Sequence, residues 1–131
     1  MNEISEDERL ALSEAAWSVR NNAHLHGRTH VGCAVLSDDG QIFVGCNIEH
    51  RFRSHDIHAE VNAISTLVAA GKRKLRAVLI AAERDRFTPC GSCLDWIFEL
   101  GGEDCLVLSE QLPGKPADYH RARDLMPYYP N

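Results

Sequence analysis

Two short motifs built from metal-ligating residue types limit how this chain can fold. The first reads His58-Ala59-Glu60 and the second reads Pro89-Cys90-Gly91-Ser92-Cys93. Each motif opens a segment with helical periodicity, and the 28 residues between them, 61 to 88, hold the rest of one helix, one strand and a loop. Such a helix–strand crossover is long enough to bring both helix starts to one edge of a sheet. We therefore expect an α/β fold in which the two motifs meet.

Periodicity and turn residues predict the other elements. Ser5-Glu6-Asp7-Glu8 has the form of a capping box at a helix start, and Asp38-Asp39-Gly40 is a strong hairpin signal between two strands. The segment from Leu75 to Ala82 is continuously apolar, as expected of a strand covered on both faces. The expected helices are 5–22, 59–70, 90–100 and 120–125; the expected strands are 31–36, 41–46, 75–82 and 105–109; and 112–118 is expected to be a loop.

This order of elements predicts a three-layer α/β/α sandwich with a mixed central sheet. The composition, 44% hydrophobic and 25% charged, is ordinary for a globular protein. The 131 residues contain no internal repeat, low-complexity segment or linker, so we expect a single domain over residues 1–131.

The charge balance argues against a nucleic-acid-binding surface. Fourteen Lys and Arg against 19 Asp and Glu give a formal charge of −5, whereas nucleic-acid binders normally carry a basic face. The nearest basic cluster, Lys72-Arg73-Lys74, is typical of a solvated turn after a helix. No apolar run has membrane-spanning length, and the N-terminal segment is acidic rather than signal-like. We expect a cytoplasmic protein with no nucleic-acid partner and no membrane association.

The five cysteines fall into two groups. In the cytoplasm thiols stay reduced, so disulfides do not account for them. Cys33, Cys46 and Cys105 stand in apolar, strand-like surroundings and are expected to be small core residues. Cys90 and Cys93 form a Cys-x-x-Cys turn, which in a reducing compartment is typical of a metal site or a redox pair.

Together with His58, the pair Cys90 and Cys93 makes a ligand set suited to zinc. Positions i and i+3 lie on one helical face, and a helix N-terminus favours thiolates even before a metal binds. One imidazole and two thiolates leave one position of a tetrahedral Zn²⁺ open, as in catalytic zinc sites. Water in that position ionises near neutral pH and becomes a nucleophile. We expect one Zn²⁺ per chain.

Glu60 is the expected catalytic residue. It stands two residues from His58, where it can take a proton from the attacking water and deliver it to a ring nitrogen and to the leaving ammonia. The combined pattern H-x-E…P-C-x-x-C is the signature of zinc-dependent deaminases. Two other interpretations stay open. One is a closed structural zinc site with His55 or Asp56 as fourth ligand, and the other is a non-catalytic, zinc-stapled binding protein.

Further segments resemble the cytidine deaminase family, from the first helix to Leu100. The segment 31–36, Val-Gly-Cys-Ala-Val-Leu, is similar to the family's V-G-A-A-L strand, and Gly45-Cys46-Asn47-Ile48-Glu49 is similar to its G-x-N-x-E segment. The step of eleven residues from Asn47 to His58 is also shared. The resemblance implies a cytidine deaminase-like fold and hydrolysis of cytidine or deoxycytidine to uridine or deoxyuridine with ammonia release, as in pyrimidine salvage.

The resemblance also implies residue roles and an assembly. In the family the Asn and Glu bind sugar hydroxyls, and an alanine near the zinc reads the base, which implies substrate-binding roles for Asn47, Glu49 and Ala59. Short members form homotetramers with active sites completed across subunits, so we expect a homotetramer, with a homodimer as the alternative. A C-terminal aromatic of the family implies that Tyr128 or Tyr129 reaches a neighbouring site.

The metal motifs depart from the family pattern in a coherent way. Short members usually have Cys where His58 stands, and Arg where this chain has Val61 and Leu94. Three thiolates on Zn²⁺ leave a charge of −1 and favour a cationic neighbour. A site with one histidine and two thiolates is neutral and needs none.

The expected pocket departs further. Thr29 and Arg53 replace aromatic residues of the family, and the polar, cationic segment 50–55 replaces a small, neutral one. This segment is either an exposed loop or part of a remodelled pocket for a larger, more polar or anionic substrate, with Phe52 or Phe87 as the stacking surface. The related blasticidin S deaminases also lack the stacking aromatic. An antibiotic nucleoside or another amino-heterocycle, such as a purine or triazine, is therefore the alternative substrate.

Overall fold

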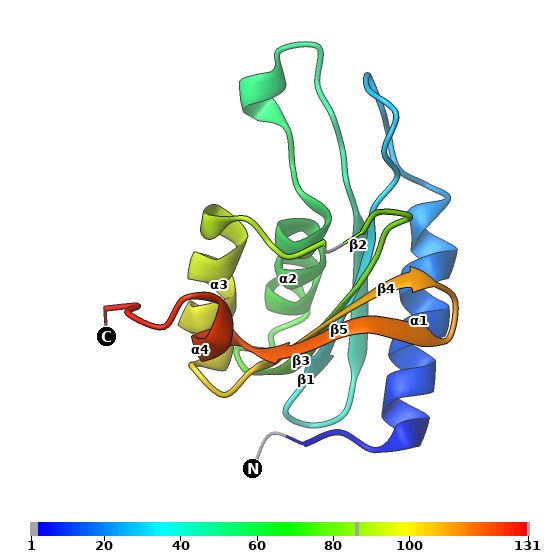
Figure 1. The fold of residues 1–131 in the computed structure, drawn as a ribbon. Helices are drawn as coiled ribbons and strands as arrows, with labels where there is room; N and C mark the ends of the chain where they lie inside the picture. Colours follow the sequence, from blue (N-terminus) through cyan, green and yellow to red (C-terminus); the bar gives the residue numbers. More distant parts are fainter. Residues whose placement is uncertain (1–2, 86, 131) are drawn as a thin grey trace.

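The computed structural model describes residues 3–85 and 87–130, and Figure 1 shows how its helices and strands are arranged. In chain order they are α1 (Glu6–Arg20), β1 (Gly32–Ser37), β2 (Ile42–Cys46), the 3-10 helix η1 (Arg53–His55), α2 (Ala59–Ala69), β3 (Leu75–Ala81), α3 (Gly91–Gly101), β4 (Leu106–Leu112), β5 (Lys115–Arg121) and α4 (Ala122–Leu125).

The strands form one sheet in the order β2-β1-β3-β4-β5. β1 runs antiparallel to both β2 and β3, whereas β3 and β4 are parallel and β4 and β5 antiparallel. A parallel pair requires a crossover connection, and α3 provides it between β3 and β4. The sheet is therefore mixed, as the order of elements predicted.

Helices cover both faces of this sheet (Figure 1). α1 lies on one face, where Leu12 shares a buried cluster with Leu79. α2 and α3 lie on the opposite face, where Leu67 and Ile97 share a second buried cluster with Ile80. Neighbouring side chains of a strand point to opposite faces, so β3 contributes Leu79 to one core and Ile80 to the other. The predicted three-layer α/β/α arrangement is confirmed.

The ends of two helices agree with their sequence signals. Ser5 Oγ accepts a hydrogen bond from the Glu8 N–H, and the Glu8 carboxylate accepts one from the Ser5 N–H, which completes the predicted capping box. Gly71, after α2, has a φ of +90°, a conformation that favours glycine. Within residues 3–85 and 87–130, no helix is both long and apolar enough to cross a membrane.

α2 lies unusually close to β2, and this contact positions the first motif. A Cβ atom at Gly45 would lie 2.3 Å from the backbone nitrogen of Ala63, so only glycine fits there. One residue along the strand, Asn62 Oδ1 accepts a hydrogen bond of 2.9 Å from the Cys46 N–H. These contacts hold α2, with His58 just before it, against the edge strand β2.

The C-terminal region differs from the sequence prediction. The loop expected at 112–118 is wrong, because β4 extends to Leu112 and β5 (Lys115–Arg121) returns antiparallel to it. Gly114, with a φ of +76°, lies in the turn between them. β5 is an edge strand whose polar sequence lacks the apolar alternation that predicts a strand. The helix expected at 120–125 covers only Ala122–Leu125, since the residues before it belong to β5.

Candidate metal and active site

The two motifs meet at the N-terminal ends of α2 and α3. His58 occupies the N-cap position of α2, Cys90 occupies the N-cap position of α3, and Cys93 lies in the first turn of α3. The sulfur atoms of Cys90 and Cys93 each lie 3.4 Å from His58 Nδ1. The structure thus brings both helix starts to one edge of the sheet, as the crossover argument predicted.

The donor atoms of this group fit zinc. One imidazole nitrogen and two sulfurs lie within 4.8 Å of one another, and among the described residues the group has no fourth His, Cys, Asp or Glu member. The closed site with His55 or Asp56 as fourth ligand therefore finds no support in the described part of the chain. Three protein ligands of this kind are typical of a catalytic zinc site with one open position.

His58 and Cys90 occupy N-cap positions, but their side chains do not hydrogen-bond to the free N–H groups of the helices that follow. The Ser5 side chain, by contrast, caps α1. The imidazole and the thiol therefore point to each other rather than to the helix backbone. At these two positions the sequence gives up a local stabilisation that an Asp or Ser would supply.

The expectation that metal-free thiolates are favoured is wrong for Cys93. Its side chain is fully buried, and burial, together with the nearby Glu60 and Cys90, raises the pKa of the Cys93 thiol well above its usual value. Desolvation outweighs the helix N-terminus here, because the charged form loses its hydration. Metal binding at this site must release a proton from Cys93.

Glu60 lies in the first turn of α2, beside these ligands. Only 3% of the residue is exposed, and burial raises the pKa of its carboxyl, although the neighbouring His58 ring and Cys93 thiol act in the opposite direction. A raised pKa makes this carboxyl a better proton acceptor than an ordinary glutamate, which suits general acid–base catalysis.

A cavity of about 480 Å³ opens over His58, Glu60 and Cys90. All three residues that the resemblance assigns to substrate binding, Asn47, Glu49 and Ala59, lie in its wall. The structure places them where a ligand could touch them, and their contact with substrate stays a prediction.

Asn47 and Glu49 also hold a neighbouring loop in place. The Asn47 amide accepts a hydrogen bond of 2.9 Å from the Val31 N–H and donates one of 2.8 Å to the Thr29 carbonyl. Glu49 Oε1 accepts hydrogen bonds of 2.7 Å from the N–H groups of His26 and Gly27. The hydrogen bond from Gly27 is the main reason why the pKa of Glu49 is lowered, so this carboxylate is ionised at neutral pH.

The cavity wall also contains residues that the sequence motifs did not assign. Phe87 lies in this wall, and the guanidinium of Arg84 stands 5.6 Å from its ring centroid. Thr29, which stands where the resemblance expects an aromatic residue, lies in the same wall, so Phe87 offers the aromatic surface that Thr29 does not. Phe52, the other candidate, is 61% exposed and does not line this cavity.

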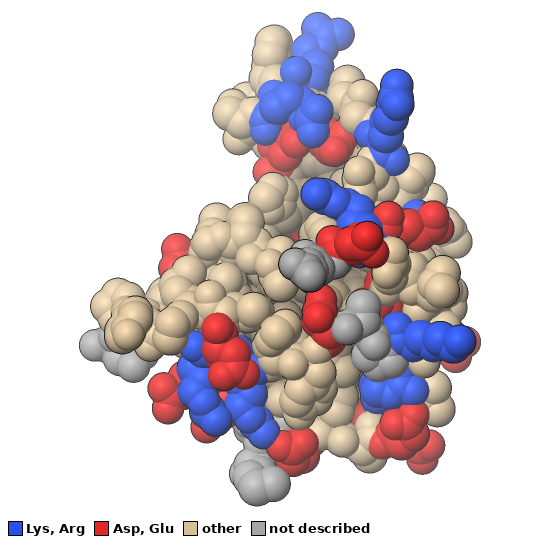
Figure 2. Space-filling view, viewed as in Figure 1, with Lys and Arg blue, Asp and Glu red and all other residues tan. Residues whose placement is uncertain are grey.

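Segment 50–55 contributes one residue to the cavity. Arg53 lines it, whereas His50, Arg51 and His55 line a second, neighbouring hollow. Figure 2 shows Lys and Arg side chains gathered at the top of the view, with carboxylates directly beneath them. The ion pairs of Arg53 with Glu49 and Asp56 have no sequence signal, because i, i+4 spacing indicates a contact only on a helix, and only Arg53–His55 is helical in this segment.

The two C-terminal tyrosines occupy different environments. The ring of Tyr129 stacks on Phe98 of α3, with centroids 4.0 Å apart, whereas Tyr128 is 96% exposed. Tyr129 therefore packs against its own chain, and Tyr128 is the residue free to contact a neighbour.

Comparison with known proteins gives a consistent result. Residues 6–109 match a family model described as the cytidine and deoxycytidylate deaminase zinc-binding region. A probable cytidine deaminase from Dictyostelium discoideum is 31% identical over 101 residues, which are 75% of this chain and 69% of that protein. A cytidine deaminase from Sporosarcina psychrophila is 39% identical over 97 residues, covering 72% of this chain and 71% of that protein.

Solved structures agree with the sequence comparison. A crystal structure of cytidine deaminase from Burkholderia pseudomallei superposes with a TM-score of 0.82 at 32% identity, covering 90% of this chain and 95% of that one. The cytidine deaminase from Mycobacterium leprae gives a TM-score of 0.81 at 28% identity, covering 95% and 99%.

Proposed function

The chain belongs to the cytidine and deoxycytidylate deaminase family, and from this premise we propose that it hydrolyses cytidine or deoxycytidine to uridine or deoxyuridine with release of ammonia. The observation that carries the proposal is the meeting of His58, Cys90 and Cys93 beside the buried carboxyl of Glu60, at the wall of one cavity. Zinc hydrolases of this family need this combination of an open metal site and a proton carrier.

His58, Cys90 and Cys93 would hold one Zn²⁺ per chain. When bound, the ion would supply Lewis-acid chemistry, which makes a water molecule a better nucleophile near neutral pH. Glu60 would take a proton from the attacking water and deliver it to the ring nitrogen next to the amino-bearing carbon. It would then take the second proton from the hydroxyl left on that carbon and deliver it to the leaving amino group. One water is consumed and one ammonia is released, so the carboxyl ends each cycle in the state in which it began.

The remaining cavity residues would bind and orient the nucleoside. Asn47 and Glu49 would contact the sugar hydroxyls, and Ala59, which is almost fully buried beside Glu60, would contact the base. Phe87 would provide an apolar face for the heterocycle. A buried polar contact discriminates strongly between substrates that can and cannot complete it.

A second candidate is a nucleoside antibiotic of the blasticidin S type, or another amino-heterocycle such as a purine or triazine. The observation that favours it is Arg53 in the cavity wall, at a position where the family has an aromatic residue. The chemistry at Glu60 is the same in both cases, and only the substrate differs.

The test is a substrate panel with metal analysis. We expect about one zinc per chain and ammonia release from cytidine or deoxycytidine that a strong chelator abolishes and added Zn²⁺ restores. Turnover of blasticidin S or guanine in place of cytidine would favour the second candidate. A chain that binds zinc tightly but turns over none of these compounds would instead be the zinc-stapled binding protein.

We propose also that residues 1–131 work as one domain, in a cytoplasmic homotetramer or homodimer that serves pyrimidine salvage and binds no nucleic acid. Exposed aromatic residues support an assembly, since Phe52 is 61%, Trp96 49% and Tyr128 96% exposed. The formal charge of −5 supports the absence of a nucleic-acid partner. Light scattering that found a stable, active monomer of 14.6 kDa would contradict the assembly.

A further inference from the structure

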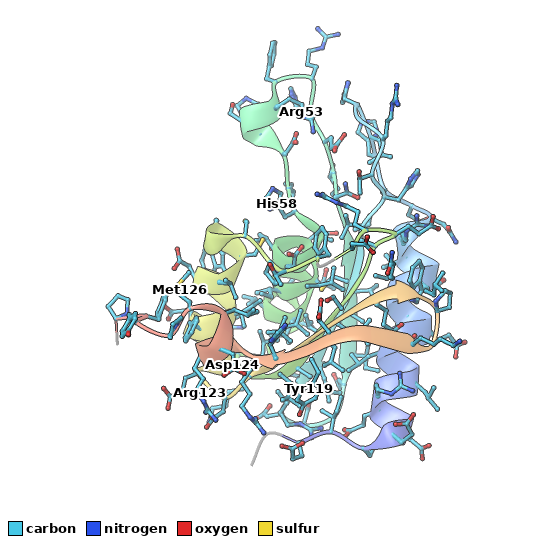
Figure 3. All side chains as sticks on the ribbon, in the orientation of Figure 1. Arg53, His58, Tyr119, Arg123, Asp124 and Met126 are labelled. Carbon is cyan, nitrogen blue, oxygen red and sulfur yellow. The ribbon has the colours of Figure 1, made fainter. Side chains whose placement is uncertain are left out.

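The chain forms a projecting arm between β2 and α2, and this arm leads directly into the candidate active site. It leaves the sheet after Cys46, turns at η1 and returns to His58 (Figure 3). Its two sides are joined at the base, where Ile48 and Ile57 pair through hydrogen bonds of 2.9 and 2.8 Å. Ile57 immediately precedes His58, so the shape of the arm is coupled to the position of that ligand.

Arg53 makes two ion pairs inside this arm. One guanidinium nitrogen lies 3.0 Å from Glu49 Oε2, and Arg53 Nε lies 2.9 Å from Asp56 Oδ2. All three side chains line the cavity. The two carboxylates are mostly shielded, with 11% and 16% of their side chains exposed, whereas the arginine is 53% exposed. Arg53 therefore covers the carboxylates on their solvent side.

The two carboxylates extend this network to the rest of the cavity wall. The second oxygen of Glu49 accepts the N–H groups of His26 and Gly27, on the loop that faces the arm. The second oxygen of Asp56 accepts the His50 N–H, 2.8 Å away, on the outgoing side of the arm. Arg53 thus joins two anchored carboxylates, and through them it connects segments of chain that are remote in sequence.

Arg53 could either bind an anionic substrate or hold the two carboxylates in place, and the charges around it favour the second role. Its single positive charge already faces two carboxylates, so it is not a free cation for an anionic substrate. An arginine fork between two anchored acceptors instead holds both in a defined direction. Of these acceptors, Glu49 is the one that the proposed function assigns to the sugar.

We propose that Arg53 is a positioning residue that aims Glu49 at the sugar hydroxyls and thereby selects substrates that carry them. The inference rests on the proposed function, and it assigns a role to a position where this chain departs from its family. Glu49 Oε2, which lies 3.0 Å from the Arg53 guanidinium in the ion pair, has capacity to accept a hydrogen bond from a hydroxyl in the cavity. Without Arg53 the carboxylate would keep its bonds to His26 and Gly27 but lose its direction toward the cavity.

The test compares two substrates that differ only at the sugar. Cytidine carries the 2′ and 3′ hydroxyls, and 2′,3′-dideoxycytidine lacks both while keeping the same base. In Arg53→Ala we expect KM for cytidine to rise about tenfold, the size of one charge-assisted hydrogen bond, with kcat within about twofold. Dideoxycytidine kinetics should be unchanged, so the preference for cytidine collapses. Arg53→Lys keeps the positive charge but not the planar guanidinium, and its KM for cytidine should lie between those of Arg53→Ala and the unaltered chain.

Arg51→Ala is the matched control, because it removes the same charge from the same arm but does not line this cavity. It should behave as the unaltered chain. An unchanged cytidine KM in Arg53→Ala, or an equal rise for both substrates, would overturn the positioning role while leaving the deaminase function intact. If Arg53→Ala loses zinc or unfolds, an unaltered cytidine preference in folded Arg53→Lys would overturn it. An unaltered chain that deaminates no nucleoside would overturn both proposals.

Discussion

Two carboxylates are buried among the described residues, on opposite faces of the sheet, and their surroundings differ completely. Glu60, 3% exposed, lies on the α2 side, where its neighbours are His58 and Cys93 of the candidate metal site. Glu110, 1% exposed, lies on the α1 side. Its oxygens accept hydrogen bonds from Ser13 Oγ at 2.6 Å and Trp17 Nε1 at 2.9 Å, with further donors from Arg9 and Gly114 at 3.3 Å.

The comparison of Glu60 with Glu110 shows that burial of a carboxylate does not by itself distinguish a catalytic residue from a structural one. A buried carboxylate that is surrounded by donors ties elements together, and Glu110 joins α1 to the β4–β5 hairpin in this way. A buried carboxyl that faces a cavity and potential metal ligands is costly for stability, and such a cost is common at functional sites. We therefore expect Glu60 to control activity and Glu110 to control stability.

The largest expected effect is on activity in Glu60→Gln. The amide keeps the size of the side chain but cannot carry a proton, so kcat should fall by roughly 10²–10⁴-fold, the contribution typical of general acid–base catalysis. Zinc content should stay near one per chain, and the melting temperature should not fall. Ammonia release and metal analysis on the same sample check both statements.

Glu60→Gln would break the comparison if the variant kept substantial turnover. It would also break it if the variant lost its zinc, since Glu60 would then be a ligand or a structural residue. Glu83→Gln, an exposed carboxylate at the end of β3 outside the cavity wall, is a suitable control and should leave kcat unchanged.

The second largest effect is on stability in Glu110→Gln. The amide cannot accept from all four donors, and a buried donor without a partner costs about 1–3 kcal/mol. The free energy of unfolding, measured with urea on zinc-loaded protein, should fall by that amount while kcat per folded chain is unchanged. Glu14→Gln, on the exposed side of α1, is the control and should leave the unfolding free energy within about 0.5 kcal/mol. A loss of activity without a loss of stability would contradict the assigned role.

These two carboxylates also show what the sequence could predict. Glu60 is recognisable because it belongs to a motif, and the elements with strong periodicity or turn signals, from α1 to α3, agree with the structure. Glu110 carries no local signal, because its donors in α1 and in the hairpin turn lie about 100 and 4 residues away. β5 was missed for a similar reason, since an edge strand with a polar sequence is stabilised by pairing with β4 rather than by its own pattern.

In the candidate site, too, residues that belong to motifs could be predicted, and residues placed by tertiary contacts could not. The sequence indicated the residues that meet at the candidate metal site, Glu60, and the three wall residues Asn47, Glu49 and Ala59, because each lies in or beside a motif. Their roles as ligands and substrate contacts stay predictions. It left open whether Phe52 or Phe87 faces the substrate and whether segment 50–55 reaches the cavity. Both questions depend on tertiary contacts of segments with little regular structure. The arm contacts residues 24–27, and Phe87 lies on the loop between β3 and α3.

An effect of similar size, on substrate binding rather than on stability, is expected for the aromatic wall of the cavity. Phe87→Ala removes the ring that would face the heterocycle, and stacking on an aromatic side chain contributes about 1–3 kcal/mol, so KM should rise roughly 5–150-fold. Phe52→Ala is the matched control, because its ring is exposed outside this cavity, and it should leave KM unchanged in the assembled protein. Steady-state kinetics with cytidine measure both. The reverse result, with Phe52 as the sensitive position, would place the stacking surface on the arm and leave Phe87 to the core beneath it.

The smallest effect concerns a third carboxylate, which has strong partners but lies at the surface. Asp39, in the β1–β2 turn, pairs with Lys72 Nζ at 2.6 Å and accepts a hydrogen bond from Ser37, and these contacts lower its pKa from 3.8 to about 2. A lowered carboxyl pKa stabilises the folded state above the unfolded-state value near pH 4, and this contribution is lost as the pH falls through about 2. Asp39→Asn should therefore be slightly less stable at pH 7, and its difference from the unaltered chain should shrink between pH 4 and pH 2. Because water and salt screen an exposed pair, the loss of unfolding free energy should be smaller than for Glu110→Gln at every pH.

Urea unfolding at several pH values measures this loss, with Asp38→Asn as the neighbouring control. A loss as large as that of Glu110→Gln would show that strong partners, rather than burial, decide which carboxylates stabilise the fold.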